Sequence, residues 1–244
     1  WDMARQAFLA GDLEKALKAA DRSIGLNPEV PKSHVLRGRI LMEMRALDQA
    51  VECLQRAETL DPANVDAQYY LGVAMERFSK KEQALDRYVR AAELEPGAPQ
   101  YALAAAEMMI DLDQLDRADQ FLKGRVSTFE HNAGVRQVLG QIATRRGDRE
   151  TAVRYLTEAR LLAPDDISVQ EDLARAQISV GKFVEAEYLL NRLLMAPENK
   201  DRRDLSLLRA RCLSEMSRHV DAREMLIKLT KDQTNAGDVE PWLA

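Results

Sequence analysis

Side chains that could catalyse a reaction or bind a metal are present in this chain, but their spacing predicts neither kind of site. The histidines, His34, His131 and His219, lie far apart, and none has a second ligand at a spacing typical of metal sites, such as HExxH. The two cysteines, Cys53 and Cys212, supply neither a disulfide framework nor a metal-ligand pattern. We expect both cysteines to be buried as small apolar side chains and not bridged.

The densest group of carboxylates, Glu107, Asp111 and Asp113, lies in the stretch EMMIDLDQLD. A pair of carboxylates acts as general acid and base only in an enclosing pocket beside a nucleophile or substrate, and the surrounding sequence indicates neither. A glycine-rich phosphate loop and a GxSxG motif are both absent from the sequence. We therefore expect neither enzymatic activity nor a cofactor.

The composition is that of an ordered, soluble protein, with 244 residues, 46% hydrophobic and 31% charged residues, and a net charge of −5. This charge provides no field that would attract nucleic acid. The densest basic stretch, TRRGDRE, is interrupted by acidic residues. No apolar run reaches the roughly 18 residues of a membrane span, so we predict no membrane insertion. The composition leaves the cytoplasm and the periplasm open.

A pattern with a period of 34 residues runs through the chain. One column of small residues consists of Ala16, Ala50, Ala84, Ala118, Ala152, Ala186 and then Ala222. A second consists of Ala4, Gly38, Gly72, Ala106, Gly140, Ala174 and Ala210. A third, one helical turn after the first, consists of Ala20, Leu54, Tyr88, Leu122, Leu156, Leu190 and Leu226. A fixed period of this length is typical of a solenoid of helix pairs.

These columns resemble the tetratricopeptide repeat family over nearly the whole chain, as seven units. The pattern is fullest in YYLGVAMERF…EQALDRYVRAAELEP and QVLGQIATRRGDRETAVRYLTEARLLAP. The resemblance implies an all-α fold, a right-handed α-solenoid (superhelix) of stacked antiparallel helix pairs. We expect a single array over residues 1–235 and a C-terminal tail at 236–244. The expected repeats are 1–30, 31–64, 65–98, 99–132, 133–166, 167–200 and 201–235.

Small residues in these columns have a physical role, because two antiparallel helices approach to about 8–10 Å only where their facing side chains are small. Gly72 and Ala84 are therefore expected at the crossing of one pair, and Pro96 ends its second helix. We place the first helix of each pair (the A helix) near 1–10, 31–44, 65–78, 99–112, 133–146, 167–180 and 202–216. The second helices (the B helices) are placed near 13–26, 47–60, 81–94, 115–127, 149–162, 183–195 and 219–231.

The fourth repeat departs from the pattern. Gly124 is expected inside its B helix, at a cost of about 1 kcal/mol relative to alanine. Arg125 replaces a small residue and Glu130 replaces the closing proline. One interpretation is a hinge between repeats four and five. The other is ordinary divergence, in which Phe129 refills the core.

Both ends of the array are abrupt, so we expect this chain to be a piece of a longer array or of a larger protein. The first repeat is expected to begin part-way into its A helix and no capping helix is expected after the seventh, whereas terminal repeats normally present a polar outer face. Near the C-terminus, Trp242 and Leu243 are expected either to pack on the open face of repeat seven or to dock into the groove of a neighbouring molecule.

In this family the A helices line a concave groove, and the repeat positions indicate which residues face it. An apolar strip of exposed side chains in repeats two to four would be followed by arginines, which favours an extended or helical peptide that is apolar at one end and acidic at the other. The alternative is scattered surface hydrophobics. The expected groove residues are Val35, Arg39, Met42, Tyr69, Val73, Arg77, Leu103, Glu107, Ile110, Gln141, Arg145, Arg175 and Arg211.

Heat-shock-protein co-chaperones of this family clamp a C-terminal carboxylate with lysine, asparagine and arginine on three successive A helices. The matching positions of three successive repeats hold Val35 and Arg39, Tyr69 and Val73, and Leu103 and Glu107, and the first unit holds Trp1 and Arg5. None of these pairs reproduces that clamp. We therefore predict a scaffold for a protein or peptide partner in the groove. The alternatives are a self-assembling homo-oligomer and a regulatory or substrate-presenting segment of a larger enzyme or envelope assembly protein.

Overall fold

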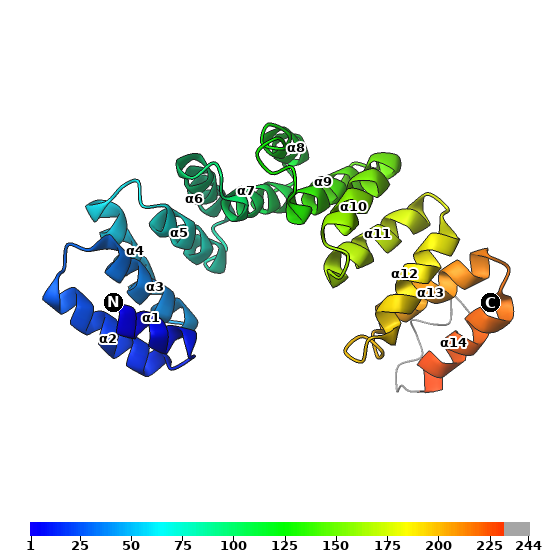
Figure 1. Cartoon of the computed structure of the whole chain (residues 1–244), viewed down its shortest axis with the longest axis horizontal. Helices are drawn as coiled ribbons and strands as arrows, with labels where there is room; N and C mark the ends of the chain where they lie inside the picture. The colour runs from blue at the N-terminus through cyan, green and yellow to red at the C-terminus, as the bar shows by residue number, and fades with distance from the viewer. Residues whose placement is uncertain (232–244) are drawn as a thin grey trace. The chain divides into compact units, whose positions relative to one another are not determined.

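The computed structural model describes residues 1–231, and every regular element in that range is an α-helix (Figure 1). The fourteen helices are α1 (Asp2–Leu9), α2 (Leu13–Leu26), α3 (Pro31–Glu43), α4 (Leu47–Leu60), α5 (Val65–Arg77), α6 (Lys81–Leu94), α7 (Pro99–Asp111), α8 (Leu115–Lys123), α9 (Ala133–Arg145), α10 (Arg149–Leu162), α11 (Ile167–Ser179), α12 (Phe183–Met195), α13 (Arg203–Glu215) and α14 (His219–Lys231). Odd-numbered helices are A helices and even-numbered ones are B helices, as the 34-residue period predicts.

These helices begin where local sequence chemistry stabilises a helix start. Pro31 and Pro99 occupy the first turns of α3 and α7, where proline's missing N–H removes no helical hydrogen bond. The side chain of Asp12 accepts a hydrogen bond from the Lys15 amide (3.1 Å), and that of Asn64 from the Ala67 amide (3.0 Å). Such caps satisfy backbone donors that the first turn of a helix leaves unpaired.

The chain forms two compact units, residues 1–129 (unit 1, α1–α8) and residues from Glu130 onward (unit 2, described as α9–α14). Within each unit successive helices pack side by side (Figure 1). In addition, α1 contacts α3, α3 contacts α5, and α9 contacts α11. Each of these A helices therefore has two packed sides, one against a B helix and one against a neighbouring A helix.

In three A–B helix pairs, a glycine lies at the crossing of the two helices, where no larger residue fits. A Cβ at Gly72 would lie 2.6 Å from Cε1 of Tyr88, one at Gly38 would lie 2.8 Å from Cγ of Leu54, and one at Gly140 would lie 2.6 Å from Cγ of Leu156. Real Cβ atoms do not approach other heavy atoms so closely. The small column and the large column of the sequence therefore pack directly against each other.

The turn from A helix to B helix has the same geometry in all seven pairs within residues 1–231. One residue of each turn has a positive φ, between 57° and 78°: Gly11, Arg45, Ser79, Asp113, Gly147, Gly181 and Ser217. This left-handed conformation strains residues that carry a side chain but not glycine. Four of the seven turns therefore hold a strained residue.

Helix α8 differs from the sequence-based expectation. It ends at Lys123, and Gly124 caps it with an ordinary helical φ of −63°, so the expected glycine inside the helix is wrong. The turn that follows places Phe129 in the core, with 4% of its surface exposed. Phe129 therefore fills the core, which both the divergence and the hinge interpretation allow. The boundary between the two units falls directly after Phe129, and the hinge remains a prediction.

Both cysteines are buried and unbridged, as expected. Burial raises the pKa of the Cys53 thiol, and it raises the pKa of Cys212 to about 11. Neither thiol is therefore an activated nucleophile at neutral pH. The proposed packing of Trp242 and Leu243 lies outside the described residues.

The close approach at Gly72 leads to a test of the helix-crossing geometry. Gly72→Ala should destabilise the protein by about 1–3 kcal/mol, because the added methyl group collides with the Tyr88 ring. Gly97→Ala is the matched control, since a Cβ there meets no atom within 4 Å. Urea denaturation followed by circular dichroism measures both, and an unchanged midpoint for Gly72→Ala would show that the crossing tolerates a side chain.

The strained turns lead to a second pair of variants. Ser79→Gly should stabilise the protein by about 0.5–1 kcal/mol, since it relieves a left-handed conformation at a modest cost in unfolded-state entropy. Gly147→Ser, the reverse change in the equivalent turn, should destabilise by about 1 kcal/mol without any collision. Equal denaturation midpoints for the two variants and the parent protein would contradict this explanation.

Candidate functional site

Three residues of the expected apolar strip are not on the surface. Val35, Met42 and Ile110 are 4%, 3% and 5% exposed, so the expectation that they belong to an exposed apolar strip is wrong, while their place along the groove stays a prediction. Val35 and Met42 pack in one core cluster with Leu71 of α5. The reason is that α3 is covered by α5 as well as by its own B helix. Ile110 occupies the same repeat position in α7 as Met42 does in α3, and it is also buried.

The other three residues of that strip, Tyr69, Val73 and Leu103, are half-buried. Tyr69 lies in an aromatic cluster, with its ring centroid 5.1 Å from that of Tyr70, 5.6 Å from that of Tyr88 and 5.3 Å from that of Tyr101. Desolvation raises the pKa of Tyr69, and it raises the pKa of Tyr101 to about 12. These rings link α5, α6 and α7 and leave only part of their surface for a partner.

Carboxylates gather beside this aromatic cluster. The Tyr88 hydroxyl donates a hydrogen bond to Glu76 (2.6 Å). Partial desolvation raises the pKa of Glu107, and repulsion from Glu76 and Asp111 raises it further. The expected groove residue Glu107 therefore lies in an acidic part of the A-helix surface.

Arg77 holds two repeats together. Its guanidinium donates a hydrogen bond to the Met42 carbonyl at the end of α3 (2.7 Å) and pairs with Glu43 (3.4 Å). The backbone oxygens of the last turn of a helix have no partners within the helix. Arg77 satisfies one of them, so its donors are engaged within unit 1.

In unit 2 most of the expected groove residues are also engaged. Gln141 donates to the Asp172 carboxylate (2.7 Å), and Arg175 pairs with Asp204 (3.2 Å). Hydrogen bonds from Arg202 hold the pKa of Asp204 below its usual range. Arg175 and Arg211 line one pocket together with Arg149, whereas Arg145 is not among its lining residues. Of the three unit 2 arginines expected in the groove, the structure thus brings together two, Arg175 and Arg211.

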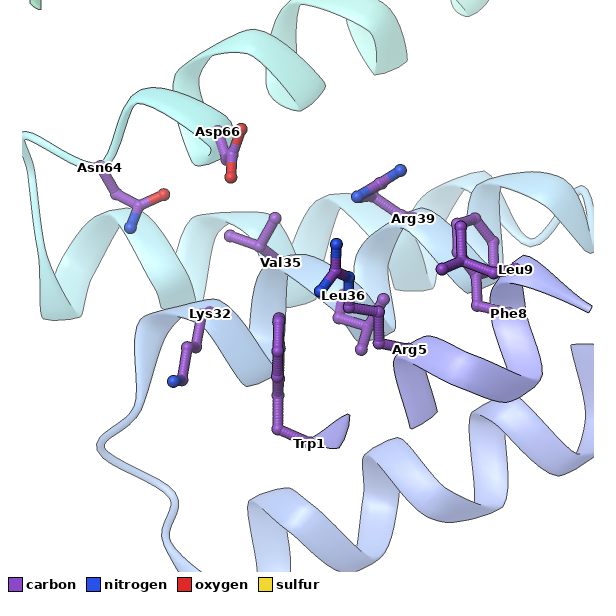
Figure 2. Close-up of a pocket in the computed structure, with 10 residues that line it drawn as sticks. All are labelled: Trp1, Arg5, Phe8, Leu9, Lys32, Val35, Leu36, Arg39, Asn64 and Asp66. Carbon is purple, nitrogen blue, oxygen red and sulfur yellow. The ribbon is translucent and has the colours of Figure 1, made fainter. Parts of the chain in front are cut away.

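A pocket in unit 1 lies across three successive A helices and holds about 660 Å³ of space, part of it open to solvent (Figure 2). Two of the expected groove residues, Val35 and Arg39, line it. The full lining is Trp1, Arg5, Phe8, Leu9, Lys32, Val35, Leu36, Arg39, Asn64 and Asp66. Sequence reasoning missed the contribution of α1, although Arg5 and Arg39 are one period apart and so share a repeat position.

The cations of this pocket lie against aromatic rings. The Arg39 guanidinium carbon is 5.1 Å from the centroid of Phe8 and 4.7 Å from that of Tyr70. Arg5 and Lys32 lie 5.5 Å and 4.9 Å from the centroid of Trp1. Figure 2 shows the Trp1 ring between those two side chains. Contacts of this kind favour a cation over the face of a ring.

No carboxylate of residues 1–231 lies within ion-pair distance of Arg5, Lys32 or Arg39; every described ion pair involves other residues. The acidic residue of the lining is Asp66, which accepts a hydrogen bond from the Tyr101 hydroxyl (3.3 Å). Three cations against one carboxylate make the pocket positive.

Two other features bear on function. Residues 1–231 contain no group of three or more His, Cys, Asp or Glu side chains placed to hold a metal ion. None of the helices described here combines the length and the hydropathy that crossing a bilayer requires.

Comparison with known families finds two matches within the chain. Residues 38–77 match a model described as a TPR repeat, and residues 143–203 match a model described as a tetratricopeptide repeat. No curated protein sequence shows a significant match to this chain.

Solved structures of helical repeat proteins match the fold. A tetratricopeptide repeat protein from Parabacteroides merdae aligns over 99% of this chain and 95% of its own, with 17% identity and a TM-score of 0.69. The APC/C hetero-tetramer Cut9–Hcn1 aligns over 98% of this chain with 17% identity and a TM-score of 0.71, and this chain spans 47% of the matched chain. YrrB, described as a TPR protein with an unusual peptide-binding site, aligns over 85% of this chain and 97% of its own, with 15% identity and a TM-score of 0.58.

The two family matches lie in different units, and the fourteen helices of residues 1–231 fit about seven such repeats. The fold of such repeats is a scaffold for protein–protein interactions. This chain, with about seven helix pairs, belongs to the tetratricopeptide repeat family.

Proposed function

We propose that this chain is a protein-interaction scaffold and that the A-helix surface of unit 1 binds a segment of a partner protein. The observation that carries this proposal is the pocket across α1, α3 and α5, whose three cations have no ion-pair partner among residues 1–231. A surface used only to hold repeats together would pair its charges, as Arg77 does with Glu43.

The shape of the pocket supports the same function. Each of the three A helices contributes side chains from one face, so a chain that crosses these helices can contact all of them. Leu9 provides an apolar contact, with 73% of its surface exposed.

YrrB is described as having a peptide-binding site. At 15% identity this likeness supports the fold, and the proposal rests on the pocket of unit 1. We expect the partner segment that binds this surface to be short and either extended or helical, since such segments present side chains at regular intervals to a groove.

Selection from a random peptide library displayed on phage tests the proposal directly. Bound peptides should slow amide exchange in α1, α3 and α5 and leave α2 and α4 unchanged. Leu9→Asn should weaken the selected peptides by about tenfold, because an apolar contact is lost. Leu26→Asn, a matched change at a leucine of α2 with 81% exposure, should leave binding unchanged.

Two results would contradict this assignment. Selected peptides that protect the B helices would place the binding surface on the opposite side of unit 1. Peptides that bind Leu9→Asn and the parent chain equally well would exclude the pocket as the contact.

A further inference from the structure

The B helix α12 of unit 2 carries an uncharged row of side chains on its exposed face. Val184 and Tyr188 are each 62% exposed, and Met195 is 74% exposed. Together with the half-buried Asn191 they follow one another at intervals of four, three and four residues, so they lie along one face of the helix. These four residues are called the α12 stripe. The opposite face of the helix packs in the core of unit 2.

The other B helices of residues 1–231 carry charge at the same repeat positions. In the five preceding repeats the residue that corresponds to Val184 is acidic and lies in the first turn of its helix, where the helix dipole favours a negative charge. In α14 the residue that corresponds to Tyr188 is Glu224. The α12 stripe is therefore the one without charge. The five acidic residues are Glu14, Asp48, Glu82, Asp116 and Glu150.

Single apolar side chains scattered over a surface need no partner, whereas a row of them along one helix indicates a contact surface. The spacing of the α12 stripe is that of the positions at which two helices of a coiled coil face each other. We infer that α12 pairs antiparallel with α12 of a second copy of this chain, about a two-fold axis. This surface belongs to unit 2, and the inference goes beyond the function proposed for unit 1.

An antiparallel pair brings unlike positions of the stripe together. Val184 of one copy faces Met195 of the second copy, and Tyr188 faces Asn191. Each of these contacts occurs twice, because a two-fold axis uses the same surface of both copies. The apolar ends of the stripe cover each other in this way. In the middle, the Asn191 amide lies opposite the Tyr188 hydroxyl, and these groups can donate and accept hydrogen bonds.

Charges beside the stripe favour this pairing. Glu185 and Arg192 flank the stripe on the same side, and both are exposed. In the antiparallel pair Glu185 of each copy lies opposite Arg192 of the other, at positions where charge sets the orientation of paired helices. Within residues 1–231 Glu185 has no ion pair, since the described ion pairs of α12 involve Glu187 and Arg192.

Arg192 keeps donors for a second carboxylate. Its present partner is Asp165, at 2.9 Å, and the two side chains are 48% and 87% exposed. Ion pairs between side chains this exposed contribute little to stability. One nitrogen of the guanidinium makes the contact, and the group has five N–H donors in all. Arg192 can therefore pair with Glu185 of the second copy.

A parallel pair of the same helices fits the charges less well. It would place Arg192 opposite Glu187 of the second copy and leave Glu185 unused. Glu187 is already engaged, because its carboxylate accepts a hydrogen bond from Nε of Arg209 (2.8 Å) in a largely buried contact. The antiparallel pair uses the carboxylate that is free.

The interface is small. Helix α12 has 13 residues, so the paired helices are about 20 Å long. Specific, stable complexes bury at least about 1,200 Å² in total, which is more than one short helix pair supplies. We therefore expect a reversible dimer that dissociates on dilution.

Single cysteines test the orientation of the two helices. Val184→Cys and Met195→Cys are prepared as separate chains and oxidised alone and as a mixture, and the native Cys53 and Cys212 are buried in both. We expect disulfide-linked dimers on a non-reducing gel from the mixture and not from either variant alone. The reason is that a disulfide requires Cα atoms within about 7 Å, and the antiparallel pair brings position 184 to position 195 of the second copy.

Charge reversal tests the ion pairs, with sedimentation velocity over a range of concentrations as the measurement. Glu185→Arg and Arg192→Glu should each weaken dimerisation by about tenfold, because each opposes like charges at two places. The double variant should restore dimerisation, since its charges are exchanged but still opposite. Glu82→Arg, a matched change at an exposed first-turn acid of α6, should leave dimerisation unchanged.

A third variant tests the stripe itself. Tyr188→Glu introduces the residue that α14 has at the same repeat position, so we expect the fold to be kept and the dimer to be lost. Circular dichroism checks the fold.

Four results would overturn the inference: a chain that stays monomeric at its highest soluble concentration, cross-linking of Val184→Cys or Met195→Cys alone, a double charge reversal that fails to restore the dimer, or a dimer that survives Tyr188→Glu. Peptide binding by unit 1 is measured separately, so each of these results leaves the proposed function in place.

Discussion

The close contact between the small and the large column of each repeat is the constraint on which the rest of this structure depends. At Gly72 the backbone of α5 lies against the Tyr88 ring so closely that not even a methyl group fits between them. The same contact recurs at Gly38 and Gly140. In these three pairs it fixes the distance and rotation of the B helix relative to its A helix. That distance and rotation in turn determine the turn between the two helices, the contact with the next A helix and the face that stays exposed.

The A helices accordingly have little free surface. In α3 one side packs on its B helix and another on α5, and Arg77 reaches across from α5 to the last turn of α3. The remaining face carries the side chains that line the unit 1 pocket. Because that face is narrow, a few residues decide its charge, and in α1 and α3 those residues are Arg5, Lys32 and Arg39.

The sequence predicted the helices well because their period reflects the crossing contacts, which are local and repeat at 34 residues. Helix α6, for example, begins and ends where expected, at Lys81 and Leu94. Helix α8 ended early because a glycine that was expected inside the helix instead caps it. The buried state of Val35 and Met42 was missed because periodicity identifies equivalent positions without showing which of them the neighbouring A helix covers. The ring contacts of Arg39 depend on Phe8 and Tyr70 from different repeats, which no pattern within one repeat contains.

The ring contacts of Arg39 also affect how recognition could change during evolution. Arg5 and Lys32 are exposed and touch the rest of the protein mainly through Trp1, so drift at these two positions would alter ligand preference with little effect on the fold. Arg39 contacts residues of α1 and α5 as well as lining the pocket. Its replacement would disturb three helices at once. Related proteins should therefore diverge first at the rim of this pocket and last at its centre.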